Sequence, residues 1–168
     1  MKSKKSQLGH GDFIVGFVIF TIGLLLFFKY SAYILPTQDT SNEDILTEGR
    51  LISESLLSQG FPSDWTTGNV VSIGLTDGTS KVDQTKLTEF INLDYQETRN
   101  LFKTRYDYYL YFTDNNDNLI KINETIDGLG YPGIDSSNIN TIDTDRLTKI
   151  TRLVRYDSEI VKMVLLLW

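Results

Sequence analysis

The sequence predicts an α+β protein in which one long N-terminal hydrophobic helix precedes a small head of helices packed on an antiparallel β-sheet. Positions 13–35 form an apolar run with a single charge. Apolar residues then recur at helical spacing, and aromatic or β-branched runs come in pairs towards the C-terminus. We therefore divide the 168 residues into a cytoplasmic basic leader at 1–12, a transmembrane helix at 13–35 and an extracytoplasmic head domain at 36–168.

The run from Phe13 to Leu35 is long enough to cross a bilayer, which needs about 20 mostly apolar residues as helix. Its one charge, Lys29, lies near the far end and can extend to the interface. A cleavable secretory signal is the alternative. Such signals usually have about 7–15 apolar residues followed by small residues at the cut, whereas this run continues up to Pro36. The length favours a retained membrane helix.

The flanking charges predict the orientation of this helix. Lys2, Lys4 and Lys5 precede it, and the nearest charges after it are acidic, beginning with Asp39. Because positive flanks stay inside, we expect a single-pass cell-membrane protein with a cytoplasmic N-terminus and an extracytoplasmic head. From Pro36 onward the chain has 12 Lys/Arg against 21 Asp/Glu, a net charge of −9. This excludes a strongly basic nucleic-acid binder, so no nucleic-acid partner is expected.

The head is predicted to begin with a helix from Thr40 or Ser41. Its buried face is marked by small and apolar residues three or four positions apart, namely Ile45, Gly49, Ile52 and Leu56. Gly60-Phe61-Pro62 ends this helix, since Gly suits a C-terminal cap and Pro cannot continue a helix. Trp65 follows in a polar turn, where a large aromatic residue is expected to plug the end of a core.

A β-branched run at Val70–Leu75, closed by a turn at Asp77-Gly78, predicts a strand. Two short helices are expected next. Asp83 has the position of an N-cap, and Leu87, Phe90 and Ile91 form the buried stripe behind it. Asp94 and Glu97 form a second capping pattern, for a helix that runs to about Phe102.

Two hairpins complete the predicted head. Runs at 106–112 and 119–123 flank the polar segment Asp114–Asn118, and runs at 147–155 and 159–168 flank Tyr156-Asp157-Ser158. The intervening residues, from Thr125 to about Thr144, are expected to form a loop. The last strand is apolar on both faces, so the chain is predicted to end inside its own sheet.

The segment Asp114–Asn118 is a candidate cation site because it places oxygen side chains at alternate positions. An EF-hand loop requires Gly at its sixth position and Glu at its twelfth, and Leu119 and Thr125 stand there. A solvated hairpin turn is therefore favoured over a weak cation site. The acidic residues of the following loop are interpreted in the same way, as loop and capping residues (Asp127, Asp135, Asp143 and Asp145). No metal or cofactor is expected.

Two surface features accompany the predicted sheet. Asn123-Glu124-Thr125 is an N-x-Thr sequence, so Asn123 is a candidate glycosylation site on an exported domain. Its use depends on which side of the chain faces out. A basic residue also falls at about every third position before the last hairpin, in the order Arg146, Lys149, Arg152 and Arg155. We expect this series to lie on one solvated strand face, or to pair with acidic neighbours in an assembly.

The composition favours a protein that is not an enzyme. The chain has no Cys and one His, which excludes thiolate nucleophiles, disulfides and multi-His metal sites. That single residue, His10, lies beside the membrane segment and away from the head. Paired carboxylates alone do not predict catalysis in so acidic a chain.

The leader and two later motifs carry a family resemblance. The stretch from Lys4-Lys5-Ser6-Gln7 to Gly9-His10-Gly11-Asp12-Phe13 resembles the leader of archaeal type IV pilin-like proteins, which prepilin peptidase cuts just before the hydrophobic helix. The pattern Leu57-x-x-Gly60-Phe61-Pro62-x-x-Trp65, followed by Val70-x-x-Ile73-Gly74-Leu75, is similar to one found in archaeal membrane-anchored pilin-like proteins. The resemblance implies a pilin-like fold and prepilin peptidase as a partner.

The resemblance also assigns the residues that would act in processing and assembly. Leaders of this family usually carry an acidic residue at the fifth mature position; a cut after Gly9 makes Asp12 the third mature residue, and a cut after Ser6 makes it the sixth. A carboxylate at the edge of hydrocarbon is costly unless partnered, so Asp12 is expected to pair with a neighbouring subunit's N-terminal amine or Lys. Gly16 and Gly23 lie seven residues apart on about one helix face, where small residues let helices approach.

The sequence thus predicts a non-catalytic structural subunit of a filament or membrane assembly. Its membrane helix would contact lipid and pack against like subunits or other pilin-like proteins, with the acidic head facing outward. The alternative is a permanently tethered extracytoplasmic binding module, or an accessory subunit of a membrane complex, that does not polymerise.

Overall fold

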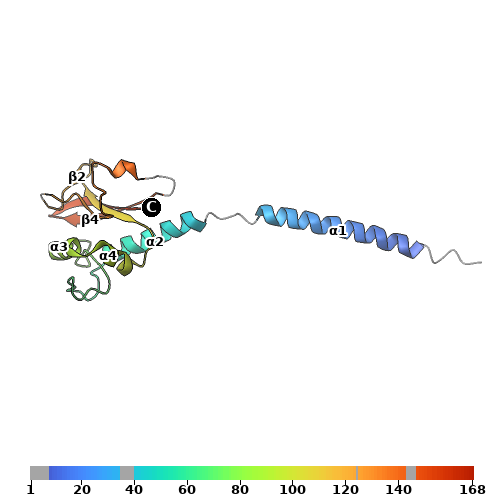
Figure 1. The fold of residues 1–168 in the computed structure, drawn as a ribbon, viewed down its shortest axis with the longest axis horizontal. Helices are drawn as coiled ribbons and strands as arrows, with labels where there is room; N and C mark the ends of the chain where they lie inside the picture. The colour runs from blue at the N-terminus through green and yellow to red at the C-terminus, as the bar shows by residue number, and fades with distance from the viewer. Residues whose placement is uncertain (1–7, 35–39, 124, 143–146) are drawn as a thin grey trace, which may run out of the picture. The chain divides into compact units, whose positions relative to one another are not determined.

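The computed structural model describes residues 8–34, 40–123, 125–142 and 147–168, with side chains described at 11–31 and, outside those gaps, from 43 onward. The chain divides into two compact units between Thr40 and Ser41. The first contains one helix, α1 (Leu8–Ile34). The second is the head, whose helices and strands are shown in Figure 1. The class is α+β, as predicted.

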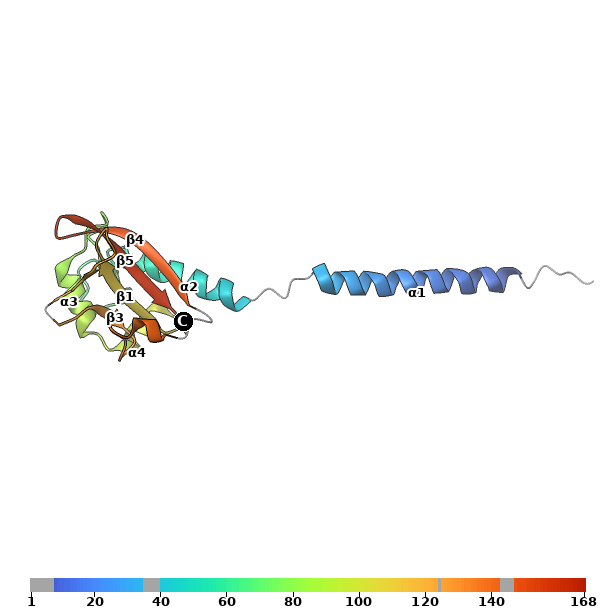
Figure 2. The same ribbon diagram turned by 90° about the horizontal axis from the view of Figure 1, so that it is seen from above.

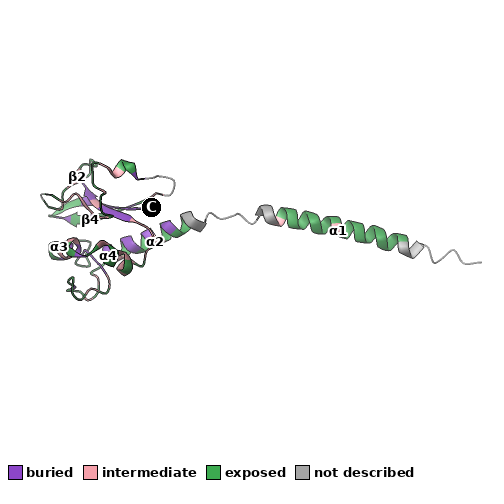
Figure 3. Cartoon of the chain, in the orientation of Figure 1, coloured by how far each residue is buried: buried purple, intermediate pink, exposed green. Residues whose placement is uncertain are grey.

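The helix α1 is apolar around its whole circumference, and its described side chains from Gly11 to Tyr30 are exposed apart from Thr21, which is partly covered (Figure 3). Its segment Gly11–Ser31 has 21 residues and is long and apolar enough to cross a membrane. The predicted span at 13–35 overlaps this segment but starts and ends later. Its last residue, Leu35, lies outside the described residues.

Three helices of the head form where the sequence places them. These are α2 (Thr40–Leu56), α3 (Gln84–Asn92) and α4 (Tyr95–Phe102). Asp83 accepts hydrogen bonds from the backbone N–H groups of Thr85 and Lys86, and Asp94 accepts one from Gln96. Both residues therefore act as the predicted N-caps, because a side-chain oxygen there satisfies N–H groups that have no partner within the helix.

The sheet is antiparallel and has five strands, β1 (Tyr108–Thr113), β2 (Leu119–Ile120), β3 (Gly128–Gly130), β4 (Thr148–Tyr156) and β5 (Glu159–Leu167). Its order is β2-β1-β5-β4, and β3 pairs with the same edge of β1 as β2 does. Figure 2 shows β4, β5, β1 and β3 in turn. Both predicted hairpins are present, with Phe112 opposite Ile120 in the first and Tyr156 opposite Glu159 in the second. The predicted loop also includes β3 and a short 3-10 helix, η2 (Ile139–Thr141).

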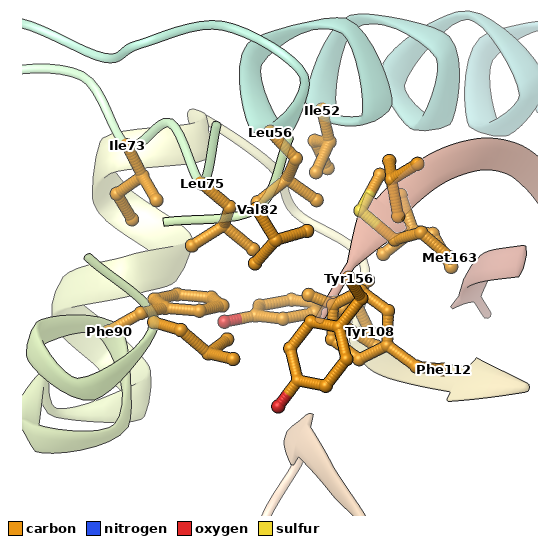
Figure 4. Close-up of a cluster of buried hydrophobic side chains, with 14 of the residues drawn as sticks. Ile52, Leu56, Ile73, Leu75, Val82, Phe90, Tyr108, Phe112, Tyr156 and Met163 are labelled. Carbon is orange, nitrogen blue, oxygen red and sulfur yellow. The ribbon is translucent and has the colours of Figure 1, made fainter. Parts of the chain in front are cut away.

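The C-terminal strand β5 lies between β1 and β4, so the chain does end inside its sheet. Its two faces enter different clusters. Met163, Leu165 and Leu167 join the main core, which α2, α3 and α4 cover (Figure 4). Val164 and Leu166 join a smaller cluster on the opposite face, which packs against residues around η2. This two-sided burial is the physical reason that the last strand is apolar at every position from Met163 onward.

The predicted strand at Val70–Leu75 is wrong. The segment crosses the C-terminal end of α2 and forms one isolated bridge, between Phe61 and Ser72. Its backbone instead bonds to carbonyls at the end of the helix, Leu75 N to Leu56 O at 2.8 Å and Thr76 N to Ser58 O at 3.1 Å. Ile73 is buried, whereas Val71 is 64% exposed. The backbone partners of the segment lie at a helix terminus, where carbonyls lack helical partners.

Candidate functional site: the apolar helix and the surface of the head

The stripe on α1 formed by Asp12, Gly16 and Gly23 is the first candidate site. At 100° per residue these three positions fall within about 40° of one another around the helix axis. Asp12 is exposed. A Cβ atom built on Gly16 or on Gly23 would meet nothing within 4 Å. The three predicted assembly residues therefore share one accessible helix face, where the absence of side chains permits a close approach by another helix.

The processing candidates fall at the start of the chain. Lys4, Lys5, Ser6 and Gln7 lie outside the described residues. Gly9 and His10 belong to the first turn of α1, which begins at Leu8, and their side chains also lie outside the described part of the chain. Gly9 and His10 thus directly precede the segment Gly11–Ser31 along the helix, and Asp12 is its second residue.

The acidic segment Asp114–Asn118 forms the turn between β1 and β2. The Asp114 carboxylate accepts hydrogen bonds from the backbone N–H groups of Asn116 and Asn118, both at 2.8 Å. The side-chain amide of Asn118 also donates to Asp114 at 2.8 Å. This bond, followed by the one from the Asn118 backbone, holds the pKa of Asp114 below its usual range because it favours the charged form. Asp117 pairs with Lys162 at 2.7 Å. The carboxylates are thus engaged in closing the hairpin, which accords with the turn interpretation.

The candidate cation ligands do not gather elsewhere. Among the described residues, no group of three or more His, Asp or Glu side chains is placed to hold a metal ion. Asp135 accepts bonds from Ser137 and Asn138, and these hold its pKa low. Asp127 faces Lys121 at 4.0 Å. Asp143 and Asp145 lie outside the described residues.

Asn123 lies just beyond β2 and is exposed. Its Oδ1 accepts hydrogen bonds from the backbone N–H groups of Thr125 at 3.0 Å and Ile126 at 2.8 Å. From the sequence alone, it was not determined whether the Asn123 side chain faces outward. In the structure it is exposed on the surface of the head. Glycosylation at Asn123 stays a prediction.

The predicted common face of the basic series is wrong. Lys149 and Arg155 are exposed, but Arg152 is partly buried and its Nε donates to Ser53 Oγ of α2 at 3.1 Å. The reason is the strand period of two: residues three apart in a strand point to opposite faces. Arg146 lies outside the described residues.

A polar network that the sequence analysis missed joins α4 to β1. The Tyr95 hydroxyl donates to Asp107 Oδ1 at 2.7 Å, and Arg99 lies 3.3 Å from the same oxygen. Tyr108 and Thr98 share a hydrogen bond of 2.6 Å. Burial raises the pKa of both tyrosines, and for Tyr95 the Asp107 carboxylate adds to the effect. These phenols therefore stay protonated and act as structural hydrogen-bonding groups.

Beside this network lies a hollow of about 230 Å³ between the two short helices and β3, lined by Phe90, Tyr95, Tyr108 and Leu129 among others. Its hydroxyl groups are already paired, as described for Tyr95 and Tyr108. The lining of the hollow mixes polar and apolar atoms, and the hydroxyl groups of Tyr95, Thr98 and Tyr108 bond to neighbouring protein groups.

Besides that network, the sequence analysis also missed the structural role of Lys86. Its side chain is buried, and Nζ donates to Gln59 O at 2.9 Å and Thr76 O at 3.0 Å. The signal was present, because Lys86 stands beside Leu87 and four residues before Phe90 on the buried stripe of α3. The lysine ties the loop after α2 to α3, which is a structural task.

Comparison with known proteins gives no family assignment: no family model, no curated protein and no solved structure matches this chain.

Proposed function

We propose that the protein is a non-catalytic, pilin-like structural subunit held in the membrane by α1. The helix would pack against the same helix of other subunits, with the acidic head outside the cytoplasm as part of a filament or membrane assembly. The observation that carries this proposal is the face of α1 formed by Asp12, Gly16 and Gly23 within a predominantly apolar segment of 21 residues. The leader resemblance adds prepilin peptidase as a processing partner.

The energetic argument concerns what α1 would do in lipid. Apolar side chains gain little from each other there, so helix association depends on close packing and on polar contacts. Gly16 and Gly23 have open space above their Cα atoms. Asp12 lies one turn before Gly16, where its carboxylate can meet an amine or lysine of a neighbouring chain at the membrane edge. The same face thus offers packing and a charge contact.

The packing of the head supports the proposal that α1 makes the contacts with the membrane and with other subunits. Its core is closed by its own helices and sheet, with Ile52, Leu110 and Leu165 each 2% exposed or less. Because these core residues are buried within the head itself, the proposal assigns the contacts with lipid and with other subunits to α1.

Disulfide crosslinking tests the proposal, because the chain has no native Cys. Gly23→Cys, expressed in native membranes and oxidised, is expected to give a crosslinked dimer. Leu25→Cys is the matched control, since it lies about 160° away around the helix. Crosslinking that is absent, or equal at both positions, would refute the proposed packing face. Asp12→Ala in the Gly23→Cys background should reduce the crosslinked fraction, and an unchanged fraction would remove the pairing role of Asp12.

A permanently tethered, non-polymerising binding module is the second candidate. It is favoured by the leader, where neither cut brings Asp12 to the fifth mature position. Mass spectrometry of the protein from native membranes distinguishes the two candidates. A mature N-terminus at Gln7 or His10 supports pilin-like processing, and an intact Met1 or Lys2 supports the permanent anchor.

A further inference from the structure

The sheet of the head has an open edge at its last strand, β4. Arg155 N donates to Ser80 O at 2.8 Å and Arg155 O accepts from Val82 N at 2.9 Å, so the backbone groups of Arg155 point away from β5. This direction alternates along a strand, so the backbone groups at positions 149, 151 and 153 point the same way. In the described part of the chain, no backbone hydrogen bond reaches these three positions from the open side. The segment 149–153 can therefore pair with a further strand, short of the stretch that Ser80 and Val82 occupy.

The opposite end of the sheet has a second open edge, at β3 (Figure 2). Tyr131 N donates to Tyr108 O at 2.8 Å, so Tyr131 points its backbone groups towards β1. By the same alternation, Gly130 and Gly128 point theirs away from β1. Over the ranges that the structure describes, no backbone hydrogen bond from beyond this edge reaches either glycine. Both ends of the sheet thus present N–H and C=O groups to which a further strand can bind.

The strand directions allow these two unlike edges to pair with each other. β4 and β1 are both antiparallel to β5, so they run in the same direction, and β3 runs antiparallel to β1. If a second head lies beside β4 in the same orientation, its β3 therefore runs antiparallel to that β4. Such a contact continues the sheet from one head into the next. It also keeps the start of α2, where each chain enters its head, on the same side in every copy.

The two edges have opposite charges on the face of the sheet that carries the smaller cluster. Lys149 is exposed on this face, opposite Leu166 of that cluster. Asp135 is exposed in the segment before η2, which packs on the same face, and the next residue, Ser136, donates to Asp127 at the start of β3. Among the ion pairs of the described residues, none engages Lys149 or Asp135. The glycines of β3 have no side chains, so they leave space for a lysine to cross the strand towards Asp135.

An apolar contact is available on the other face of the sheet. Leu46 of α2 is 38% exposed. It lies seven residues before Ser53 and so on the same side of the helix, and Ser53 accepts a hydrogen bond from Arg152 of β4 at 3.1 Å. The hollow of about 230 Å³ lies on this face beside β3, lined by Leu93 and Leu129 among others. Pairing of the two edges would bring this side of α2 towards the hollow of the next head.

We propose that β4 of one head pairs antiparallel with β3 of a second copy of the chain, with Lys149 opposite Gly130 and Thr151 opposite Gly128. Because the two edges differ, each contact leaves an open edge at both ends, and its repetition gives a row or filament. Pairing of two β4 edges about Thr151 would instead close a dimer, set Lys149 opposite Leu153 and leave both β3 edges open. The contact rests on the proposed assembly of like subunits and adds a head contact to the packing of α1.

Crosslinking between two differently tagged copies of the full chain tests this contact, since the chain has no native Cys. One copy carries Thr151→Cys and the other Ser136→Cys, and the two are co-expressed in native membranes and treated with a short bismaleimide. We expect a crosslinked heterodimer, because both positions are exposed and the pairing brings them together. Asp64→Cys, exposed in the loop after α2, is the matched control for Ser136→Cys. Its yield with Thr151→Cys should be about tenfold lower or less.

Charge variants within the same crosslinking pair test the lysine contact. Lys149→Glu in the Thr151→Cys copy should lower the heterodimer yield about fivefold or more, because a glutamate would then face Asp135. Adding Asp135→Lys to the Ser136→Cys copy should restore the yield. Lys103→Glu, at the end of α4, is the control and should change the yield less than about twofold.

A proline variant distinguishes strand pairing from a charge contact alone. Lys149→Pro and Lys149→Ala both remove the charge, but only the proline also removes the outward backbone N–H. The heterodimer yield of Lys149→Pro should therefore be about threefold or more below that of Lys149→Ala. Circular dichroism of the purified variants checks that each is folded.

Three results would overturn the proposal. The first is an equal heterodimer yield with Ser136→Cys and with Asp64→Cys. The second is a Thr151→Cys homodimer that exceeds the heterodimer, because two β4 edges would then pair with each other. The third is an equal yield for Lys149→Pro and Lys149→Ala, which would indicate contact without strand pairing. Gly23→Cys crosslinking in the same membranes reports the packing of α1 separately, so failure of the head contact and failure of the α1 contact are distinguished.

Discussion

Gly74→Ala is expected to destabilise the head strongly because the backbone leaves no room for a side chain at this position. A Cβ atom on Gly74 would lie 2.6 Å from the carbonyl carbon of Gln59 and closer still to Gly60 N and Ser58 O. All three are backbone atoms of the segment that follows α2, so no side chain can rotate away. To bring the tightest of these contacts up to 3.0 Å, the segment 58–60 and the segment around Gly74 must separate by about 1 Å.

Such a separation would stretch the hydrogen bonds that hold the crossing together. These are Leu75 N to Leu56 O at 2.8 Å, Thr76 N to Ser58 O at 3.1 Å and Trp65 Nε1 to Gly74 O at 2.9 Å. At about 1 kcal/mol net for each bond, the expected loss in free energy of unfolding is about 3 kcal/mol. For a domain of this size that corresponds to about 10 °C in the midpoint of thermal unfolding.

Urea denaturation followed by fluorescence of Trp65 and Trp168 measures this change. Gly68→Ala is the matched control, because the nearest atom to a Cβ there is Thr66 Oγ1 at 4.0 Å. The control should be neutral or stabilising by up to about 1 kcal/mol, since alanine restricts the unfolded chain. If the two variants unfold within about 0.5 kcal/mol of each other, the argument from close backbone approach is wrong.

Three further predictions concern single groups in the head. Trp65→Phe should lower the free energy of unfolding by about 1–2 kcal/mol because the buried Gly74 carbonyl loses its donor; an unchanged urea midpoint would show that this hydrogen bond contributes nothing net. Hydrogen bonds lower the pKa of Asp114 in the folded state, so its stabilising contribution is present above pH 3.8 and is lost as the pH falls through the lowered value. The free energy of unfolding of Asp114→Asn should therefore depend less on pH than that of the parent protein below pH 4. An equal pH dependence of the two proteins would contradict this prediction. Burial raises the pKa of Tyr109 to about 12, so the free energy of unfolding should fall as the pH rises from 10 through 12. In an ultraviolet titration of tyrosine ionisation, Tyr109→Phe should lack one transition near pH 12 that the parent protein shows. If the missing transition lies near pH 10, the raised pKa of Tyr109 is refuted.

Much of the fold could be predicted from local sequence. The N-caps at Asp83 and Asp94 and the hairpin at Tyr156–Glu159 are formed by neighbouring residues, so a short stretch contains both partners of each interaction. The final strand was also predictable, since continuous apolar character from Met163 onward requires burial on both faces.

The two incorrect predictions, of a strand at Val70–Leu75 and of one face for the basic series, depend on contacts between distant parts of the chain. Val70–Leu75 has the composition of a strand, but its backbone partners are the carbonyls at the end of α2, about 18 residues earlier in the chain. The basic series before the last hairpin has a spacing of three, which in a strand places Arg152 on the face opposite Lys149 and Arg155. In both cases the local residue pattern was recognised, but the groups that those residues contact in the fold were not predicted.

The sequence alone determined the two parts of this protein. They are an apolar segment able to span a membrane and an acidic head whose helix caps and hairpins have recognisable sequence patterns. It did so because these properties depend on composition and on contacts within a few residues. Only the tertiary structure decided that Gly74 lies against the backbone that follows α2, that Lys86 is buried between two carbonyls, and that β4 is the last strand of the sheet on the side away from β1. Strand order and helix crossings join residues far apart in the chain, and no local pattern encodes which surfaces remain unpaired after they form.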